Sequence, residues 1–235
     1  LLAAGEQPVA LVTPRHLEPL ARHGLRLRHA GQEQRWPLRA SDRAADLGVQ
    51  DLVIIACKAT ALGGLAPALA PMIGRDTLIL SAMNGVPWWF FHGLAPSMAG
   101  QPLESVDPGG AISRALPPSQ VIGGVVHLAA SLPEPGLVEP SRGDCVIVGD
   151  PMRRRRDGRH ADDDRAGEIA ELLRRAGIDS PWAADIHAEV WSKLWGNMTM
   201  NPVSALTGAT MATILADRDA CDLMARAMVE AGDVG

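Results

Sequence analysis

Two short apolar runs with a helix-forming segment between them constrain the fold of this chain most strongly. Asp51–Cys57 is a continuous apolar run rich in β-branched residues, and Thr77–Leu80 is a second run of the same kind. The segment between them, from about residue 59 to 72, is rich in Ala and Leu. Uniformly apolar strands that alternate with helices are typical of a parallel sheet with right-handed crossovers. The pattern therefore predicts an α/β protein.

The flanking segments extend this prediction in both directions. Leu1–Gly5 has the pattern of a last helical turn with a glycine cap, and Val9–Val12 that of a buried strand. A helix over residues 17–23 and a hairpin of segments 25–28 and 35–39 follow. Later apolar segments are separated by Pro- and Gly-rich turns instead of helices, which predicts an antiparallel extension of the sheet; they span residues 121–129, 137–139 and 145–148.

The last third of the chain is predicted to be helical. Asp185 and Asp217 are expected to be N-caps. We place the boundary between residues 181 and 184, so that residues 1–183 form the α/β domain and residues 184–235 begin a helical domain. The expected helices span residues 163–176, 185–200, 202–208 and 217–232.

Composition excludes several classes of protein. Among the 235 residues no apolar run approaches the roughly 20 residues that a membrane-spanning helix needs. The net charge of −5 gives no basic face for nucleic acid. Three widely separated cysteines fit a reducing cytosol rather than a disulfide framework or a zinc site. The absence of tyrosine excludes mechanisms that need a tyrosine acid.

Lysine is so rare that each one is conspicuous. The chain has two lysines, Lys58 and Lys193, against twenty arginines. The two residue types are exchangeable on most solvated surfaces, but only lysine offers a compact ammonium whose pKa shifts readily. We therefore expect at least one lysine to be functional; chance survival is the alternative.

Lys193 lies in a row of polar side chains. Lys193, Asn197 and Asn201 follow one another at a spacing of four, which places them on one side of a helix. Trp191 and Trp195 flank the row. An ammonium and two carboxamides in line are suited to a small polar ligand, and such a lysine could protonate a carbonyl oxygen. The alternative is an ordinary solvated helix face.

Two further polar residues follow predicted parallel strands. Lys58 follows the strand at 51–57, and Asn84 begins an Asn-Gly turn after the strand at 77–80. Ligands of open parallel sheets bind beyond the carboxyl ends of the strands, so both residues are candidates for contact with a ligand. A plain turn is the alternative for Asn84.

Arg15 follows the strand at 9–12. In a dinucleotide-binding sheet, a basic residue at such a position suits the 2′-phosphate of NADP, whereas an acidic one favours NAD. A surface arginine is the alternative.

Two other features are expected to be structural. The segment Trp88–Phe91 is predicted to pack in the core or an interface. The histidines show no metal-ligand spacing, and His127, in a strand, is expected to be partly buried and hydrogen-bonded.

Five segments in order along nearly the whole chain resemble the ketopantoate reductase (2-dehydropantoate 2-reductase) family. The most specific is the Trp-x-Lys-Leu-x-x-Asn-x-x-x-Asn-Pro pattern that begins at Trp191. The matching segments are Asp51–Ala59, Asn84–Val86, Ile122–Val126, Glu189–Asn197 and Asn201–Thr207.

The resemblance implies NADPH-dependent reduction of ketopantoate to (R)-pantoate for pantothenate and coenzyme A synthesis. It makes Lys193 the general acid and assigns Asn197 and Asn201 to the substrate. Asn84 would lie between cofactor and substrate. The implied partners are a small 2-keto acid and, as an assembly left open, a second copy in a homodimer; neither nucleic acid nor membrane is expected. The implied location is the cytoplasm.

The same resemblance completes the expected cofactor site. It places Lys58 near the nicotinamide and Ala129, on a strand, against the cofactor. Together with Arg15 and Asn84, these residues make up the expected cofactor site. The implied fold is a Rossmann-like dinucleotide-binding domain followed by an all-helical domain.

The chain also departs from the family pattern. We expect that the first strand and its Gly-x-Gly-x-x-Gly turn, and later helices that supply a serine and a glutamate, lie outside it. Pro87 stands where Gly is commoner. The alternatives are therefore a reductase of another small 2-keto acid, or a catalytically dead remnant or NADP-sensing module.

Overall fold

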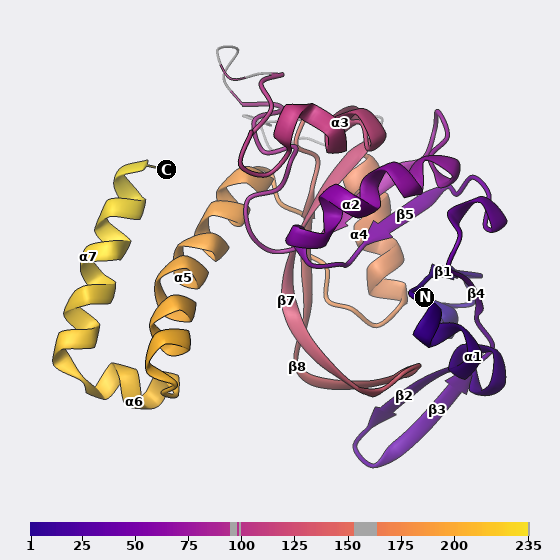
Figure 1. The fold of residues 1–235 in the computed structure, drawn as a ribbon, viewed down its shortest axis with the longest axis horizontal. Coiled ribbons are helices and arrows are strands. Elements are labelled where there is room, and N and C mark those ends of the chain that lie inside the picture. Colours follow the sequence, from indigo (N-terminus) through magenta and orange to yellow (C-terminus); the bar gives the residue numbers. More distant parts are fainter. Residues whose placement is uncertain (95–97, 99, 153–163, 235) are drawn as a thin grey trace.

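The computed structural model describes residues 1–94, 98, 100–152 and 164–234 (Figure 1). Its main feature is a six-stranded sheet in the order β3-β2-β8-β7-β6-β5. The other two strands, β1 and β4, pair in parallel with each other as a separate small sheet. The strands are β1 (Val9–Leu11), β2 (Leu25–His29), β3 (Gln32–Trp36), β4 (Arg39–Ser41), β5 (Leu52–Ile55), β6 (Leu78–Ala82), β7 (Val121–Glu134) and β8 (Leu137–Gly149).

Helices flank the sheet and then continue away from it. They are α1 (Pro14–His23), α2 (Ala59–Leu69), α3 (Ala111–Ala115), α4 (Arg165–Arg175), α5 (Ile186–Thr207), α6 (Met211–Ala216) and α7 (Arg218–Val234). Short 3₁₀ turns span Leu2–Ala4, Ala44–Asp46, Ala70–Met72, Pro108–Gly110 and Pro118–Gln120. Figure 1 shows α5 and α7 running antiparallel beside the sheet, with the short α6 joining them.

Strand direction divides the sheet into two parts. β5, β6 and β7 are mutually parallel, as the apolar runs predict. β8 runs antiparallel to β7. On its other side β8 pairs in parallel with β2, which forms an antiparallel hairpin with β3. The predicted α/β class, with an antiparallel extension, is confirmed.

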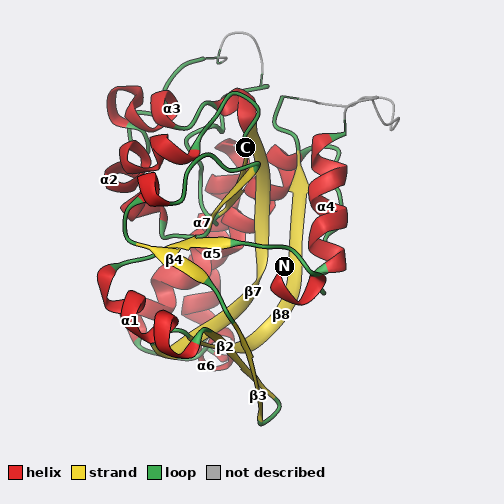
Figure 2. Cartoon of the chain, turned by 90° about the vertical axis from the view of Figure 1, so that its right-hand side faces the viewer, coloured by secondary structure: helices red, strands yellow, loops and turns green. Residues whose placement is uncertain are grey.

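Apolar side chains fill both faces of the sheet. One core lies between the sheet and the helices α2, α3 and α5, and it includes Val125, Ile186 and Val190. The second core lies under α4 and includes Leu80 and Ile122. Figure 2 shows α4 on one side of the long strands and α2 and α3 on the other. β5 and β6 end at a common edge of the sheet, and β7 continues beyond that edge to Glu134.

The segment at Trp88 belongs to this core. Trp88 and Trp89 are each 1% exposed. Trp88 Nε1 donates a hydrogen bond to the Leu116 carbonyl at 3.1 Å. The expectation of core packing is confirmed.

The antiparallel part differs from the prediction in two respects. β7 continues to Glu134, beyond the predicted end at residue 129. The segments at 137–139 and 145–148 belong to one strand, β8, rather than to two. Pro140 and Gly143, which look like strand ends in the sequence, lie where the register of β8 against β7 shifts. An irregular pairing accommodates residues that a regular ladder would exclude.

The helical part differs from the prediction in two respects. A single helix, α5, continues through Pro202, where the sequence predicts an end. Proline removes one backbone hydrogen bond but need not stop a helix that is supported by its neighbours. Both α6, which the sequence analysis did not predict, and α7 pack back onto α5. This tertiary packing outweighs the local signal.

Among the described residues, no helix combines the length and the apolar character that crossing a bilayer would require.

Gly143 is expected to be essential to the irregular pairing of β7 with β8. Its φ is +67°, and a Cβ there would lie 2.0 Å from the His127 carbonyl oxygen. We predict that Gly143→Ala lowers the free energy of unfolding by about 2 kcal/mol or more. Gly63→Ala is the control, because Gly63 is exposed inside α2 with open space around it and should gain about 0.5–1 kcal/mol. Urea denaturation measures both changes, and equal effects would contradict the prediction.

Candidate active site

The first turns of α5 anchor the candidate site. Asp185 is the N-cap, as predicted, and its Oδ1 accepts hydrogen bonds from the backbone N–H groups of His187 and Ala188. Ile186 and Val190 are buried in the core beneath the sheet. Lys193 lies one turn beyond Val190, where the helix leaves the core. The packing of the first two turns therefore sets the position of the lysine.

The ammonium of Lys193 on α5 contacts the imidazole ring of His127 on β7. The distance between Lys193 Nζ and His127 Nδ1 is 3.4 Å. Side chains alternate along a strand, so His127 lies on the same face as Val125, which packs in the core with α5. His127 is more exposed than the sequence analysis expects, but it does have a polar partner.

Asn84 fastens the end of β6 to β7. Its Nδ2 donates to the Val126 carbonyl at 3.1 Å, and the Val126 N–H donates to its Oδ1 at 3.1 Å. β6 ends at Ala82, which pairs with Gly124. The Asn84 carboxamide thus provides hydrogen bonds to β7 just beyond the point where the β6 backbone stops pairing with it. These bonds hold Val126, the residue next to His127.

The electrostatics of the pair favour a neutral imidazole. Partial burial is the largest cause that lowers the pKa of His127 below its ordinary value of 6.5, and the Lys193 ammonium lowers it further. Glu189, one turn earlier on α5, acts in the opposite direction. At neutral pH, Nδ1 of the neutral ring can accept a hydrogen bond from the ammonium.

The two other polar residues of the row continue along α5. Asn197 is half-buried and Asn201 is exposed. Neither carboxamide has a hydrogen-bond partner within the part of the chain that the structure describes. The spacing of four carries both along the side of α5 that begins at Lys193. Their amide groups can both donate and accept hydrogen bonds.

Trp191 and Trp195, which flank Lys193 in the sequence, have different neighbours in the structure. Trp195 Nε1 donates to the Met228 carbonyl at 2.7 Å and so joins α5 to α7. Trp191 packs near Phe90, with ring centroids 6.4 Å apart. Trp195 therefore holds the helical part together.

Lys58 and Ala129 lie at the expected positions of the sheet. Lys58 is exposed between β5 and α2, and its ammonium has no partner in the described ranges. Ala129 is exposed on β7, where it pairs with Arg142 after the register shift. Since β5 and β6 are neighbouring parallel strands, Lys58 and Asn84 leave the sheet at the same edge.

Arg15 stands apart from this group. It lies in the first turn of α1, is exposed, and donates from Nε to His16 Nε2 at 3.1 Å. Figure 1 shows α1 and α5 at opposite sides of the molecule. The structure therefore does not bring Arg15 close to Lys193.

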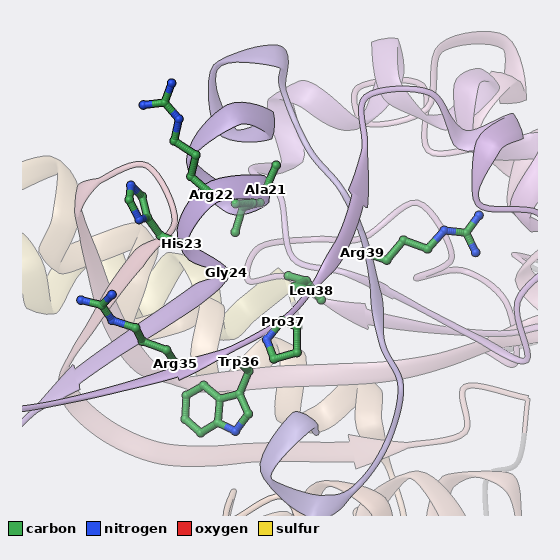
Figure 3. A pocket seen from close by; sticks show the side chains of 10 residues that line it. Ala21, Arg22, His23, Gly24, Arg35, Trp36, Pro37, Leu38 and Arg39 are labelled. Carbon is green, nitrogen blue, oxygen red and sulfur yellow. The ribbon is translucent and has the colours of Figure 1, made fainter.

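A surface hollow of about 550 Å³ lies away from all of these residues, at the end of α1. Figure 3 shows Arg22, His23 and Arg35 extending on one side of it and Arg39 on the other. The guanidinium groups are engaged by the protein: Arg22 pairs with Glu18 at 2.8 Å. Arg35 pairs with Glu33 and Arg39 donates to the Asp46 carbonyl. The hollow therefore offers little free charge for a ligand.

The sequence reasoning missed His127 as a neighbour of the lysine. The sequence shows that His127 lies in a strand two residues after Val125. Because side chains alternate along a strand, this spacing could have placed His127 on the same face of the sheet as Val125. Its pairing with a helix residue 66 positions away could not be found from either local pattern.

The comparisons with known proteins agree on one family. The profile described as "Ketopantoate reductase PanE/ApbA" matches residues 1–151, and that described as "Ketopantoate reductase PanE/ApbA C terminal" matches residues 185–235. A 2-dehydropantoate 2-reductase of Mesorhizobium japonicum is 40% identical over all of this chain and 70% of its own length.

Two further relatives show the extent of the likeness. The crystal structure of a putative ketopantoate reductase from Ralstonia solanacearum has a TM-score of 0.90 and 43% identity, over 97% of this chain and 68% of that one. A 2-dehydropantoate 2-reductase of Lactococcus lactis is 21% identical over 95% of this chain. The chain spans 64% of that relative's length, which is less than two thirds.

The two hydrogen bonds between the Asn84 carboxamide and the Val126 backbone, called the Asn84 clamp, are expected to stabilise the edge of the sheet. Asn84→Ala leaves the N–H and C=O of Val126 without these partners, and we predict a loss of about 1–3 kcal/mol in the free energy of unfolding. Amide hydrogen exchange at Val126 should become faster. Asn201→Ala is the matched control and should change stability by less than about 0.5 kcal/mol, since that carboxamide has no partner in the described chain. Unchanged protection of Val126 in the Asn84 variant would refute the role of the clamp.

Proposed function

The chain belongs to the ketopantoate reductase family, and from that premise we propose that the protein reduces 2-dehydropantoate to (R)-pantoate with NADPH. The observation that carries the proposal is the position of Lys193. Its ammonium lies at the exit of α5 from the core, against His127, with the carboxamides of Asn197 and Asn201 continuing along the same helix.

The edge residues fit a dinucleotide. The ammonium of Lys58 is exposed and unpaired in the described chain, and it suits an anionic or carbonyl-bearing cofactor. Gly85 has a φ of +100° and open space where a Cβ would lie, so the turn after Asn84 can approach a ring closely. Bound NADPH would supply a hydride to the keto carbon. We propose that Lys58, Asn84 and Ala129 hold its nicotinamide end and that Arg15 binds its 2′-phosphate.

The protein's own groups then complete the reaction. Lys193 donates a proton from Nζ to the keto oxygen as the carbon is reduced, which leaves a neutral amine and a hydroxyl group. Asn197 and Asn201 orient the substrate through carboxamides that have no partner in the described chain, and Asn84 lies where the cofactor and substrate sites adjoin. The ammonium also stabilises the negative charge that develops on the oxygen.

The location follows from the same assignment. We propose a cytoplasmic enzyme, since Cys57, Cys145 and Cys221 are all free thiols. Assembly as a homodimer stays a prediction.

The first test is NADPH oxidation with 2-dehydropantoate, pyruvate and 2-ketoisovalerate as parallel substrates, using the native gene product that contains this chain. Selective turnover of 2-dehydropantoate is the expected result. Turnover of another acid would preserve the mechanism and change the substrate. A folded protein that binds NADPH but reduces none of the three would be a sensor or an inactive remnant.

Lys193→Met should reduce kcat by ~10²–10⁴ because it removes the general acid while keeping side-chain length. Ser192→Ala is the control: Ser192 is exposed at the adjacent position of α5 and should leave kcat unchanged. Steady-state kinetics at saturating NADPH make the comparison. A Lys193 variant with native kcat would show that another group donates the proton.

Arg15→Ala tests the proposed contact with the 2′-phosphate. We expect the KM for NADPH to rise about tenfold, the effect of losing a charge-assisted hydrogen bond, with little change in the KM for NADH. Equal changes for the two cofactors would assign Arg15 to the protein surface instead.

A further inference from the structure

We propose that His127 is the positioning residue for Lys193: its neutral ring accepts a hydrogen bond at Nδ1 from the ammonium and so directs Nζ toward the substrate. The inference rests on the proposed function and deepens it by adding a residue to the same site. His127 acts through the lysine and is not itself a proton donor to the substrate.

The need for such a residue follows from the lysine side chain. Lysine carries its charge on a flexible four-carbon stem, so its ammonium is poorly oriented without a partner. Among the described residues, Lys193 has no carboxylate within ion-pair distance, and the contact of 3.4 Å with His127 Nδ1 is the polar interaction that holds it. A neutral acceptor orients Nζ without neutralising its charge.

The backbone around His127 is built to place the ring. On one side, Asn84 bonds both backbone groups of Val126, the preceding residue. On the other side, the ladder with β8 shifts register between His127 and Ala129. Gly143, opposite, allows an approach to the His127 carbonyl that a Cβ would block. Register shifts of this kind re-aim side chains next to active sites.

The charged groups of α5 act on the ring in opposite directions. Partial burial and then Lys193 lower the pKa of His127, and Glu189 raises it. The net direction is downward, so the ring stays neutral at neutral pH and becomes protonated only below its ordinary range. From the end of β6 the neighbouring side chain is Asn84, which carries no charge.

On β8, the residue paired with His127 is Cys145. Burial is the first cause that raises the pKa of the Cys145 thiol, and Asp179 and Asp144 raise it further, so this thiol is uncharged near neutral pH. The charged neighbours of Cys145 along β8 are Asp144 and, beyond Gly143, Arg142. The titration of His127 is therefore expected to respond chiefly to Lys193 and Glu189.

Protonation of His127 removes the acceptor and places a second cation beside Lys193. The ammonium then turns away, and kcat falls. The folded-state pKa of His127 is lowered, so the neutral form predominates at the ordinary pKa and is lost as the pH falls through the lower folded-state value. We expect an acid limb of kcat in that window.

Nuclear magnetic resonance of the imidazole measures the pairing without any turnover. In Lys193→Met, the pKa of His127 should rise, because a neighbouring cation has been removed. In Glu189→Gln it should fall further, which is the matched control of opposite sign. A His127 pKa that is unchanged in Lys193→Met would overturn the pairing.

Steady-state kinetics then test whether His127 positions Lys193 for the reaction. His127→Leu keeps approximate size without an acceptor, and kcat should fall about tenfold or more with the KM for NADPH unchanged. His127→Asn places Oδ1 near the position of Nδ1, so it should restore most of kcat and abolish the acid limb. His29→Leu, on the exposed β2–β3 hairpin, should behave as wild type. Equal losses in the Leu and Asn variants would overturn the positioning role.

Failure of the proposed function gives a different result. If the wild-type protein reduces none of the three keto acids, the reductase assignment falls, while the titration in Lys193→Met still decides whether the two side chains are paired. An active enzyme whose His127→Leu variant retains native kcat and the acid limb would keep the function and overturn the inference.

Discussion

The close approach of α5 to β7 is the constraint on which the site depends. A Cβ at Gly123 would lie 2.7 Å from Ile186 Cγ1 and 2.8 Å from the Trp89 ring. Glycine at this point of the strand lets the first turn of α5 lie directly against the sheet. Ile186 and Val190 are then buried, and the next turn brings Lys193 to the height of His127. A larger residue at position 123 would move the helix and with it Lys193.

The elements around this contact were largely predictable from local pattern. The apolar runs at residues 51–57 and 77–80 specify parallel strands. β6 is largely buried as predicted, whereas β5 is the edge strand of the sheet and its Ile54 is exposed. The spacing of four from Lys193 to Asn201 specifies one side of a helix, and Asp185 marks its start. Both strand-end residues, Lys58 and Asn84, leave the sheet at one edge because parallel strands end together. These features depend on neighbours in the sequence.

The unpredicted features depend on contacts between distant segments. Pro140 and Gly143 break a regular strand, yet β8 continues past them because β7 pairs with it on both sides of the shift. Pro202 does not end α5 because α6 and α7 pack against that helix. Asn84 was predicted as a ligand contact from its turn, but its carboxamide also forms two hydrogen bonds with the backbone of Val126 on β7. This role could not be predicted because it depends on β7 continuing past the end of β6. In each case tertiary contact outweighs the local preference.

The polar groups of the site fall into two kinds. Asn84 and His127 have partners in the protein, and these partners belong to the backbone or to Lys193. Asn197 and Asn201 have none in the described chain, although leucine or glutamate would favour the helix more. Fixed groups beside free ones are the arrangement expected of a preorganised site: the fixed groups aim the reactive atom, and the free groups remain available to the substrate. The division also explains why a substitution at Asn84 should affect stability, whereas Asn197 and Asn201 are available to the proposed substrate.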